Sequence, residues 1–296
     1  MKPGPEVRTP YQFILFAEEC FETAGLFYGH GTDNAYDEAA YLVLRALGLP
    51  FELDDSQLNQ ELGEEVSTFL GDLIRQRIEQ RKPVAYILNE AWFCGLPFYV
   101  DESVLIPRSP LAELITEQFA PWCDPTGVKR ILDVGTGSGC IAIACAKAFP
   151  GAKVDAIDLS REALAVAEEN VRRHQLTDSM RLVRSDLYAN LAGQRYDIIV
   201  ANPPYVDAED MSSLPAEFSH EPRLALEAGD DGLDIVRRIL KQSRDYLEDD
   251  GILICEVGNS QQALVEAFPA CPFLWFEFEH GGHGVFLLTA EQLDQL

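Results

Sequence analysis

The spacing of hydrophobic residues along the chain changes near residue 84. Between about residues 11 and 81, apolar side chains recur every three or four positions, which predicts three amphipathic helices. Asp33 or Asn34 is placed to cap the second helix, and Gly48 and Pro50 follow its end. Pro83 stops the third helix, because proline lacks the amide hydrogen that a helix interior needs. The first part of the chain is therefore expected to be helical.

The rest of the chain predicts a β-hairpin followed by an α/β unit. Between residues 84 and 105, aromatic and branched side chains flank Gly95-Leu96-Pro97, a pattern typical of a hairpin. From Arg130 onward, short apolar runs alternate with helical segments, which indicates a parallel sheet covered by helices on both faces. The expected strands are residues 131–134, 154–157, 182–183, 197–201, 252–257, 273–278 and 284–288. The last two must be antiparallel, because a parallel connection needs a dozen residues or more.

The charge of the chain restricts its partners. Its 296 residues include 49 Asp and Glu but only 23 Lys and Arg, giving a net charge of −26. Since affinity for nucleic acid rests on Lys and Arg contacts to phosphates, duplex DNA is not expected as a stable partner. An acidic surface instead attracts a basic partner, such as a ribosomal protein. The alternative explanation is that the acidic residues only keep the protein soluble.

Cysteine use and hydropathy predict where the protein works. The number of cysteines, seven, is odd, and their spacing does not match a zinc site. Free thiols in a reducing cytoplasm are therefore expected, with no metal. Cys140 and Cys145 fall in an alanine-rich helix and are interpreted as small core residues. No apolar signal core opens the chain and no apolar run reaches the length of a membrane span. A cytoplasmic location without membrane contact follows as the expectation.

A glycine-rich loop and two acidic strand ends predict a cofactor site. The loop runs from Asp133 through Gly135, Thr136, Gly137 and Gly139, and its Gly-x-Gly-x-Gly spacing differs from the dinucleotide pattern, which disfavours NAD. About 20 residues later, Asp158 closes the second strand, where such carboxylates bind ribose hydroxyls. Asp186 and Leu187 close the third strand, where an adenine edge would lie.

The tetrapeptide Asn202-Pro203-Pro204-Tyr205 follows the fourth predicted strand. Ligands of open α/β sheets bind at the carboxyl ends of strands. The two prolines stiffen the turn and remove two amide donors, so the Asn202 oxygen and the Pro203 carbonyl remain as acceptors. A planar group that carries an NH2 would fit between these acceptors, with Tyr205 against its face. The tetrapeptide is therefore interpreted as a site that presents a planar nitrogen to chemistry.

With these motifs in place, residues from about 130 to 290 resemble a class I methyltransferase that uses S-adenosylmethionine. Nearly the whole chain is similar to the protein-glutamine N5-methyltransferases. Segments such as Tyr28–Asn34 and His220–Arg223 resemble the subtype that methylates the third large-subunit ribosomal protein. The release-factor subtype typically reads Pro-Arg-Pro-Asp-Thr-Glu where this chain reads Pro107-Arg108-Ser109-Pro110.

The resemblance implies a mostly parallel seven-stranded sheet with an antiparallel last strand. It also implies a helical substrate-recognition domain over residues 1–83, a hairpin linker over 84–107 and the methyltransferase domain over 108–296. S-adenosylmethionine is the implied cofactor, with Asp133 and the glycine loop near its positive sulfonium. Asn202 and Pro203 would accept the two N–H groups of a target glutamine while Tyr205 packs on the amide, without a base or a metal. Pro204 and Arg108 are further candidate substrate contacts, and His30 is interpreted as a structural residue.

Three other functions stay open at this point. The first is methylation of a glutamine in peptide-chain release factors, which differs only in the substrate. The second is methylation of an exocyclic amine in RNA or DNA, which requires a flipped or single-stranded base and is disfavoured by the charge. The third is a scaffold that binds the cofactor without catalysis, although the intact motifs give no sign of lost activity.

Overall fold

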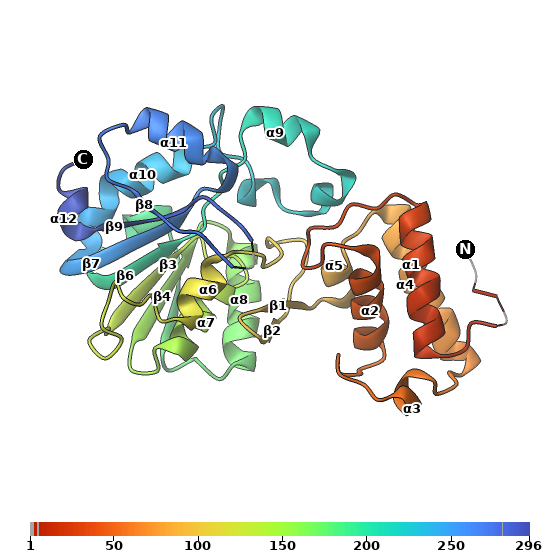
Figure 1. Cartoon of the computed structure of the whole chain (residues 1–296). Coiled ribbons are helices and arrows are strands. Elements are labelled where there is room, and N and C mark those ends of the chain that lie inside the picture. The colour runs from red at the N-terminus through yellow and green to blue at the C-terminus, as the bar shows by residue number, and fades with distance from the viewer. Residues whose placement is uncertain (1–2, 5, 280) are drawn as a thin grey trace. The chain divides into compact units, whose positions relative to one another are not determined.

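The structure is a computed structural model that describes residues 3–4, 6–279 and 281–296. Its chain divides into two compact units (Figure 1). The first, called the helical unit here, is Met1–Ala91 together with Pro215–His220. The second, called the sheet unit, is Trp92–Leu214 together with Glu221–Leu296. Among the described residues, no helix has both the length and the apolar character to cross a membrane.

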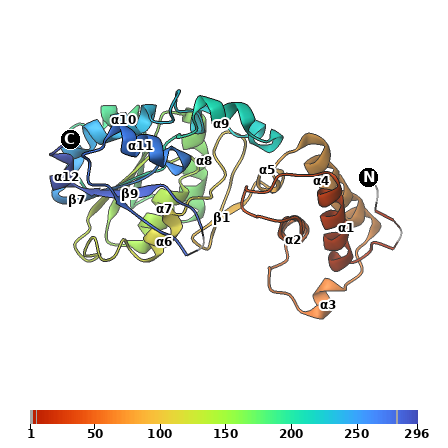
Figure 2. The ribbon, with the colours of Figure 1, turned by 45° about the horizontal axis from the view of Figure 1, so that its top comes forward.

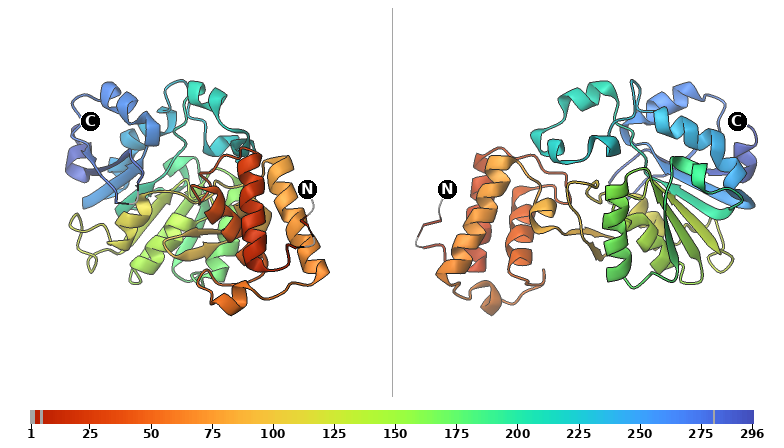
Figure 3. Two further views of the ribbon diagram at one scale, coloured as in Figure 1. Left: turned by 45° about the vertical axis from the view of Figure 1, so that its right-hand side comes forward. Right: turned by 180° about the vertical axis from the view of Figure 1, so that it is seen from behind.

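The helical unit contains the three helices that the sequence predicts, together with three short helical segments. Figure 3 shows its long helices α1 and α4 side by side. Asn34 is the residue that caps α2, with its side chain accepting from the amide of Asp37. The elements are α1 (Pro10–Thr23), α2 (Ala35–Ala46), α3 (Asp55–Leu58), α4 (Glu64–Gln80), α5 (Val84–Leu88) and a 3-10 helix (Ala216–His220).

A buried ion cluster lies inside the helical unit. The guanidinium of Arg77 is fully buried and bonds to Glu38, to the carbonyl of Phe27 at 2.8 Å and to Glu217 at 3.3 Å. Glu217 also accepts from the amide of Phe27 at 3.0 Å. The segment Pro215–His220 thus supplies a charged partner to helices that lie far earlier in the chain.

The hairpin is shorter than the sequence predicts. Residues 84–88 form α5, because Pro83 starts a helical turn and Asn89, in the left-handed conformation, ends it. Only β1 (Ala91–Phe93) and β2 (Leu96–Phe98) pair, around the turn at Cys94 and Gly95. The apolar residues after Phe98 lie in a buried loop instead of a strand.

The sheet unit is built on one seven-stranded sheet with the order β5-β4-β3-β6-β7-β9-β8. The chain runs parallel through β5, β4, β3, β6 and β7, whereas β9 is antiparallel to both of its neighbours. The predicted fold class is confirmed. The strands are β3 (Arg130–Val134), β4 (Lys153–Asp158), β5 (Met180–Arg184), β6 (Tyr196–Ala201), β7 (Leu247–Glu256), β8 (Leu274–Trp275) and β9 (Val285–Thr289).

Helices cover both faces of this sheet, as the alternating sequence pattern predicts. Figure 2 shows α10 and α11 on one side of the sheet and α6 and α7 on the other. The helices are α6 (Leu111–Thr116), α7 (Cys140–Ala148), α8 (Arg161–Arg173), α9 (Ala208–Ser213), α10 (Asp234–Ser243), α11 (Gln261–Ala267) and α12 (Ala290–Leu293). Short 3-10 helices are Leu187–Asn190, Arg223–Ala225, Arg244–Tyr246 and Gly258–Ser260.

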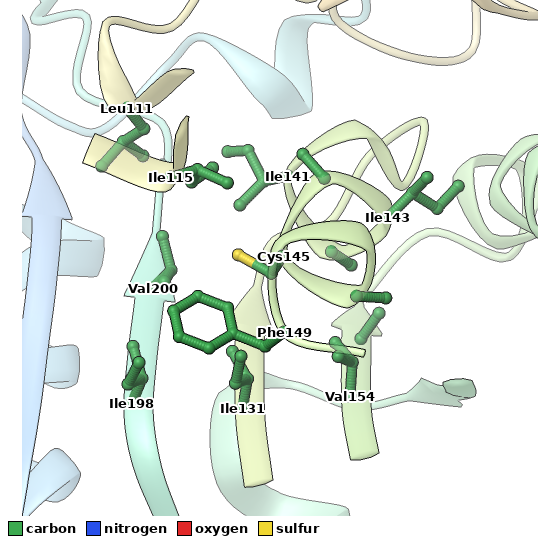
Figure 4. Close-up of a cluster of buried hydrophobic side chains, with 14 of the residues drawn as sticks. Leu111, Ile115, Ile131, Ile141, Ile143, Cys145, Phe149, Val154, Ile198 and Val200 are labelled. Atoms are coloured by element: carbon green, nitrogen blue, oxygen red, sulfur yellow. The ribbon is translucent and has the colours of Figure 1, made fainter. Parts of the chain in front are cut away.

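The central strands are apolar on both faces. Ile131, Ile198 and Val200 pack with Cys145 of α7 and with Phe149, the residue after that helix, in one buried cluster (Figure 4). Their strand neighbours, such as Leu132 and Ile199, belong to a second cluster with α10 and α12 on the opposite face. This two-sided burial is typical of parallel sheets and fixes the strands, so the loops at their carboxyl ends are held on a rigid base.

Candidate functional site

A cavity of about 230 Å³ lies at the carboxyl ends of β3, β4, β5 and β6. All of its lining residues belong to the sheet unit. The predicted site residues that line it are Arg108, Gly135, Thr136, Gly137, Asp158, Asp186, Leu187, Asn202, Pro203 and Pro204. Asp133, Gly139 and Tyr205 are described by the structure and do not line it. The cavity therefore gathers ten of the thirteen predicted residues.

The glycine loop after β3 forms one wall of the cavity. The amides of Gly135 and Thr136 both donate to the carbonyl of Ile157 at 2.9 Å, which ties the loop to the end of β4. Gly135 and Gly137 have φ values of +75° and +53°, a region that favours glycine over residues with a side chain. The loop thus turns sharply and exposes its backbone to a ligand.

Two carboxylates lie where the sequence predicts them, Asp158 as the last residue of β4 and Asp186 two residues after β5. Asp158 accepts from the amide of Gly137 at 2.9 Å and from the amide of Ser160 at 2.8 Å, and burial raises its pKa. One hydrogen bond per oxygen leaves each with a further lone pair for a ligand hydroxyl. Asp186 is more exposed and accepts from Arg238 at 2.8 Å, a cavity-lining partner that the sequence interpretation missed.

Asp133 lies beneath the glycine loop. Its carboxylate accepts from the hydroxyl of Thr136 at 2.6 Å and from the amide of Ala142 at 3.2 Å. Burial raises its pKa to about 7, although these two hydrogen bonds lower it. Asp133 therefore shapes the loop from inside, and its contact with a sulfonium stays a prediction.

The tetrapeptide presents acceptors to the cavity. Neither the side-chain amide of Asn202 nor the carbonyl of Pro203 has a hydrogen-bond partner within the described part of the chain. Tyr205 instead turns into the protein, where its hydroxyl donates to Glu256 at 3.1 Å. The first two residues thus line the cavity, and their contact with a substrate amide stays a prediction, as does the packing of Tyr205 on that amide.

Two buried glutamates support the wall that carries Arg108. Glu221 accepts hydrogen bonds from the two terminal guanidinium nitrogens of Arg108, at 2.6 and 2.7 Å. It also accepts one from the amide nitrogen of Ile106, at 3.0 Å. Glu256 accepts from the hydroxyl of Ser109 as well as from Tyr205. The sequence interpretation missed both roles. For Glu256 a signal existed, because it is an acidic residue at a strand's carboxyl end, like Asp158.

The residues of the cavity fit S-adenosylmethionine. The Asp158 oxygens keep lone pairs that a ligand hydroxyl can use. In addition, the buried hydroxyl of Ser138 in the glycine loop has no protein partner among the described residues. Apolar side chains that line the same cavity offer surfaces for a flat adenine ring. They are Ile157, Leu159, Leu187 and Ile235.

The fold and this cavity define the chain as a class I S-adenosylmethionine-dependent methyltransferase. A family model described as methyltransferase small domain matches residues 114–230. A ribosomal protein uL3 glutamine methyltransferase of Francisella tularensis is 48% identical over 269 residues, covering 90% of this chain and 86% of the relative. A protein of the same name from Xanthomonas campestris is 45% identical over 288 residues, covering 97% and 93%. The chain belongs to the family of ribosomal protein uL3 glutamine methyltransferases.

Solved structures agree on the fold. The catalytic domain of hMettl16, solved in complex with an RNA hairpin, superimposes with a TM-score of 0.53. The match covers 77% of this chain and 82% of that domain at 18% sequence identity. At this identity the likeness concerns the architecture alone.

Proposed function

We propose that this enzyme transfers a methyl group from S-adenosylmethionine to the side-chain amide nitrogen of a glutamine in ribosomal protein uL3. The observation that carries the proposal is the pair of acceptors, Asn202 and Pro203, in the lining of a cofactor cavity. Two relatives that share nearly half of the residues carry this activity in their names, which favours uL3 over release factors. A net charge of −26 suits a basic substrate.

An amide nitrogen is a weak nucleophile, because its lone pair is delocalised into the carbonyl. S-adenosylmethionine supplies a methyl group that is already strongly electrophilic, so the protein's task is alignment and electrostatics. The Asn202 oxygen and the Pro203 carbonyl accept the two amide N–H groups and orient the nitrogen. The same acceptors stabilise positive charge as the new N–C bond forms. The methylated nitrogen then loses one proton to water, and no carboxylate of the protein needs to remove it earlier.

The helical unit is proposed to select the substrate. The described residues before position 84 do not line the cofactor cavity, which leaves their surface available for the substrate. We assign to them, with the hairpin, the contacts to protein surface around the target glutamine. The enzyme is proposed to act in the cytoplasm, where ribosomal proteins are made.

Labelling tests the function directly. The enzyme is incubated with tritiated S-adenosylmethionine and with uL3 purified from cells that lack the enzyme, and the labelled peptide is sequenced by mass spectrometry. Label on a glutamine of uL3 is expected, and Asn202→Ala serves as the variant that should lose it.

A peptide-chain release factor is assayed in parallel under the same conditions. Methylation of the release factor with uL3 left unlabelled would overturn the substrate assignment. Label on neither protein, from an enzyme that binds the cofactor, would overturn the proposed activity as well.

A further inference from the structure

Glu256 joins two parts of the site that are far apart in the sequence. It is the last residue of β7, its side chain is buried, and its two oxygens have different partners. One oxygen accepts from the Tyr205 hydroxyl at 3.1 Å, and the other accepts from the Ser109 hydroxyl. Ser109 also accepts from the amide of Leu111, the first residue of α6. One carboxylate therefore ties the tetrapeptide to the wall that carries Arg108.

Tyr205 is held on three sides. Besides the bond to Glu256, its carbonyl accepts from the hydroxyl of Ser260 at 2.7 Å. A Cβ added to Gly258 would come within 2.5 Å of the Tyr205 ring, so the ring lies directly on the backbone of that glycine. These contacts leave the side chain little freedom, and the phenol is oriented by Glu256.

The sheet places this contact next to the reactive end of the tetrapeptide. In the parallel pairing of β6 and β7, Ala201 lies opposite Cys255, so Asn202 and Glu256 both follow the last paired position. Asn202 is three residues before Tyr205. A tilt of the Tyr205 end of this stiff, proline-containing turn is therefore transmitted to the Asn202 oxygen and the Pro203 carbonyl.

We infer that Glu256 is a positioning residue for methyl transfer. It holds the Tyr205 phenol and the Ser109 hydroxyl, and so fixes the two acceptors of the tetrapeptide at the angle that the substrate amide requires. The inference rests on the proposed function, since it concerns the geometry of that same site. Glu256 does not line the cavity, so we expect it to act through Tyr205 and Ser109 and not by touching the cofactor.

The ionisation of Glu256 gives this role a pH signature. Burial raises the pKa of its carboxyl to about 7, against the lowering effect of the bonds from Ser109 and Tyr205 and of the charge of Arg108. Glu221 is the other charged group near the Tyr205 hydroxyl. The ionised carboxylate accepts both O–H groups, whereas the protonated form turns one oxygen into a donor. Turnover should therefore rise as pH increases through about 7.

The test compares Glu256→Gln and Glu256→Ala with the wild type. Gln keeps the volume and one acceptor, and Ala keeps neither. Glu248→Gln is the matched control, because Glu248 lies on the same strand and is exposed. The measurements are turnover and KM for uL3 across neutral pH, cofactor affinity by calorimetry, and thermal unfolding.

The expected result for Ala is a loss on the order of 100-fold in turnover, since a displacement of about 1 Å has effects of that size. Gln should lose less, and its turnover should change less steeply with pH near neutrality than that of the wild type, because Asp133 then remains as the buried acid with a pKa of about 7. Cofactor affinity and the control should match the wild type. Wild-type turnover in a folded Gln and Ala variant, or a wild-type pH profile in Gln, would overturn the inference.

A double-mutant cycle checks the contact without using the substrate. Unfolding midpoints of Glu256→Gln, Tyr205→Phe and the double variant should be non-additive, because the two groups share one hydrogen bond. Additive midpoints would refute the contact on which the inference depends. If the wild type fails to methylate uL3 while the cycle is non-additive, the proposed function fails and the contact stands.

Discussion

Replacing Asp158 by alanine tests the cofactor site, because this carboxylate has two separate duties. In the folded protein it accepts the amides of Gly137 and Ser160, at 2.9 and 2.8 Å. With cofactor bound, we expect its remaining lone pairs to accept the ribose hydroxyls. The variant Asp158→Ala therefore removes two internal hydrogen bonds and the proposed ribose contact together.

The magnitudes follow from these contacts. A hydrogen bond to a charged group contributes about 1.5–3 kcal/mol, and burial of Asp158 offsets part of that gain. The free energy of unfolding should therefore fall by roughly 1.5–3 kcal/mol in total. Loss of the ribose contact should weaken cofactor binding by about 1–3 kcal/mol, or roughly 5- to 150-fold in Kd.

Calorimetry with two ligands separates the two duties. S-adenosylhomocysteine and an analogue without ribose hydroxyls are titrated into the wild type, Asp158→Ala and the control Asp178→Ala, whose carboxylate is exposed. The wild type and the control should prefer the ligand with hydroxyls, whereas Asp158→Ala should bind both equally. Unchanged affinity in a folded Asp158→Ala, or a preference that survives the substitution, would refute the assignment of Asp158 to the ribose.

Three further predictions concern other parts of the chain. Asn202→Ala should keep cofactor binding but lose on the order of 100-fold in turnover, as removal of an oxyanion-hole donor does, and Asn202→Asp should retain more activity than Ala. Equal loss in both would show that the NH2 group is required, and unchanged turnover in the Ala variant would make the tetrapeptide only a structural turn. Arg77→Met should lower the free energy of unfolding in denaturant titrations by roughly 3–5 kcal/mol, since it leaves Glu38 and Glu217 buried without their cation; a change below 1 kcal/mol would contradict this reasoning. Removing residues 1–83 should leave cofactor binding intact and abolish methylation of folded uL3, whereas normal methylation would make that segment structural only.

The fold was predictable where local signals and burial agree. Asn34 and Ser160 cap the helices that the sequence predicts, because a side-chain oxygen at a helix start satisfies a free amide whatever its surroundings. The hairpin was predicted too long, since aromatic residues after Phe98 mark a buried loop as readily as a strand. The strand expected over 273–278 narrows to β8, Leu274–Trp275, at the edge of the sheet.

The site was predictable where its residues lie at or directly after a predicted strand. The glycine loop, Asp158 and Asn202 each stand at a strand end, which parallel topology brings to a single edge. The Arg108–Glu221 and Glu256–Tyr205 pairs were not predictable, because their members lie 113 and 51 residues apart. Such contacts depend on the packing of loops, which no periodicity in the sequence encodes.

The buried partner that Pro215–His220 gives to Arg77 affects how the enzyme is made. Glu217 is added to the growing chain 140 residues after Arg77. Domains near the amino terminus generally fold first during synthesis. In this protein the amino-terminal helices leave the ribosome long before Glu217, which completes their buried ion cluster. Their final packing can therefore form only after most of the sheet unit has been translated. Maturation of the two units is thereby linked in time, and a chain interrupted before residue 215 leaves the first unit unfinished.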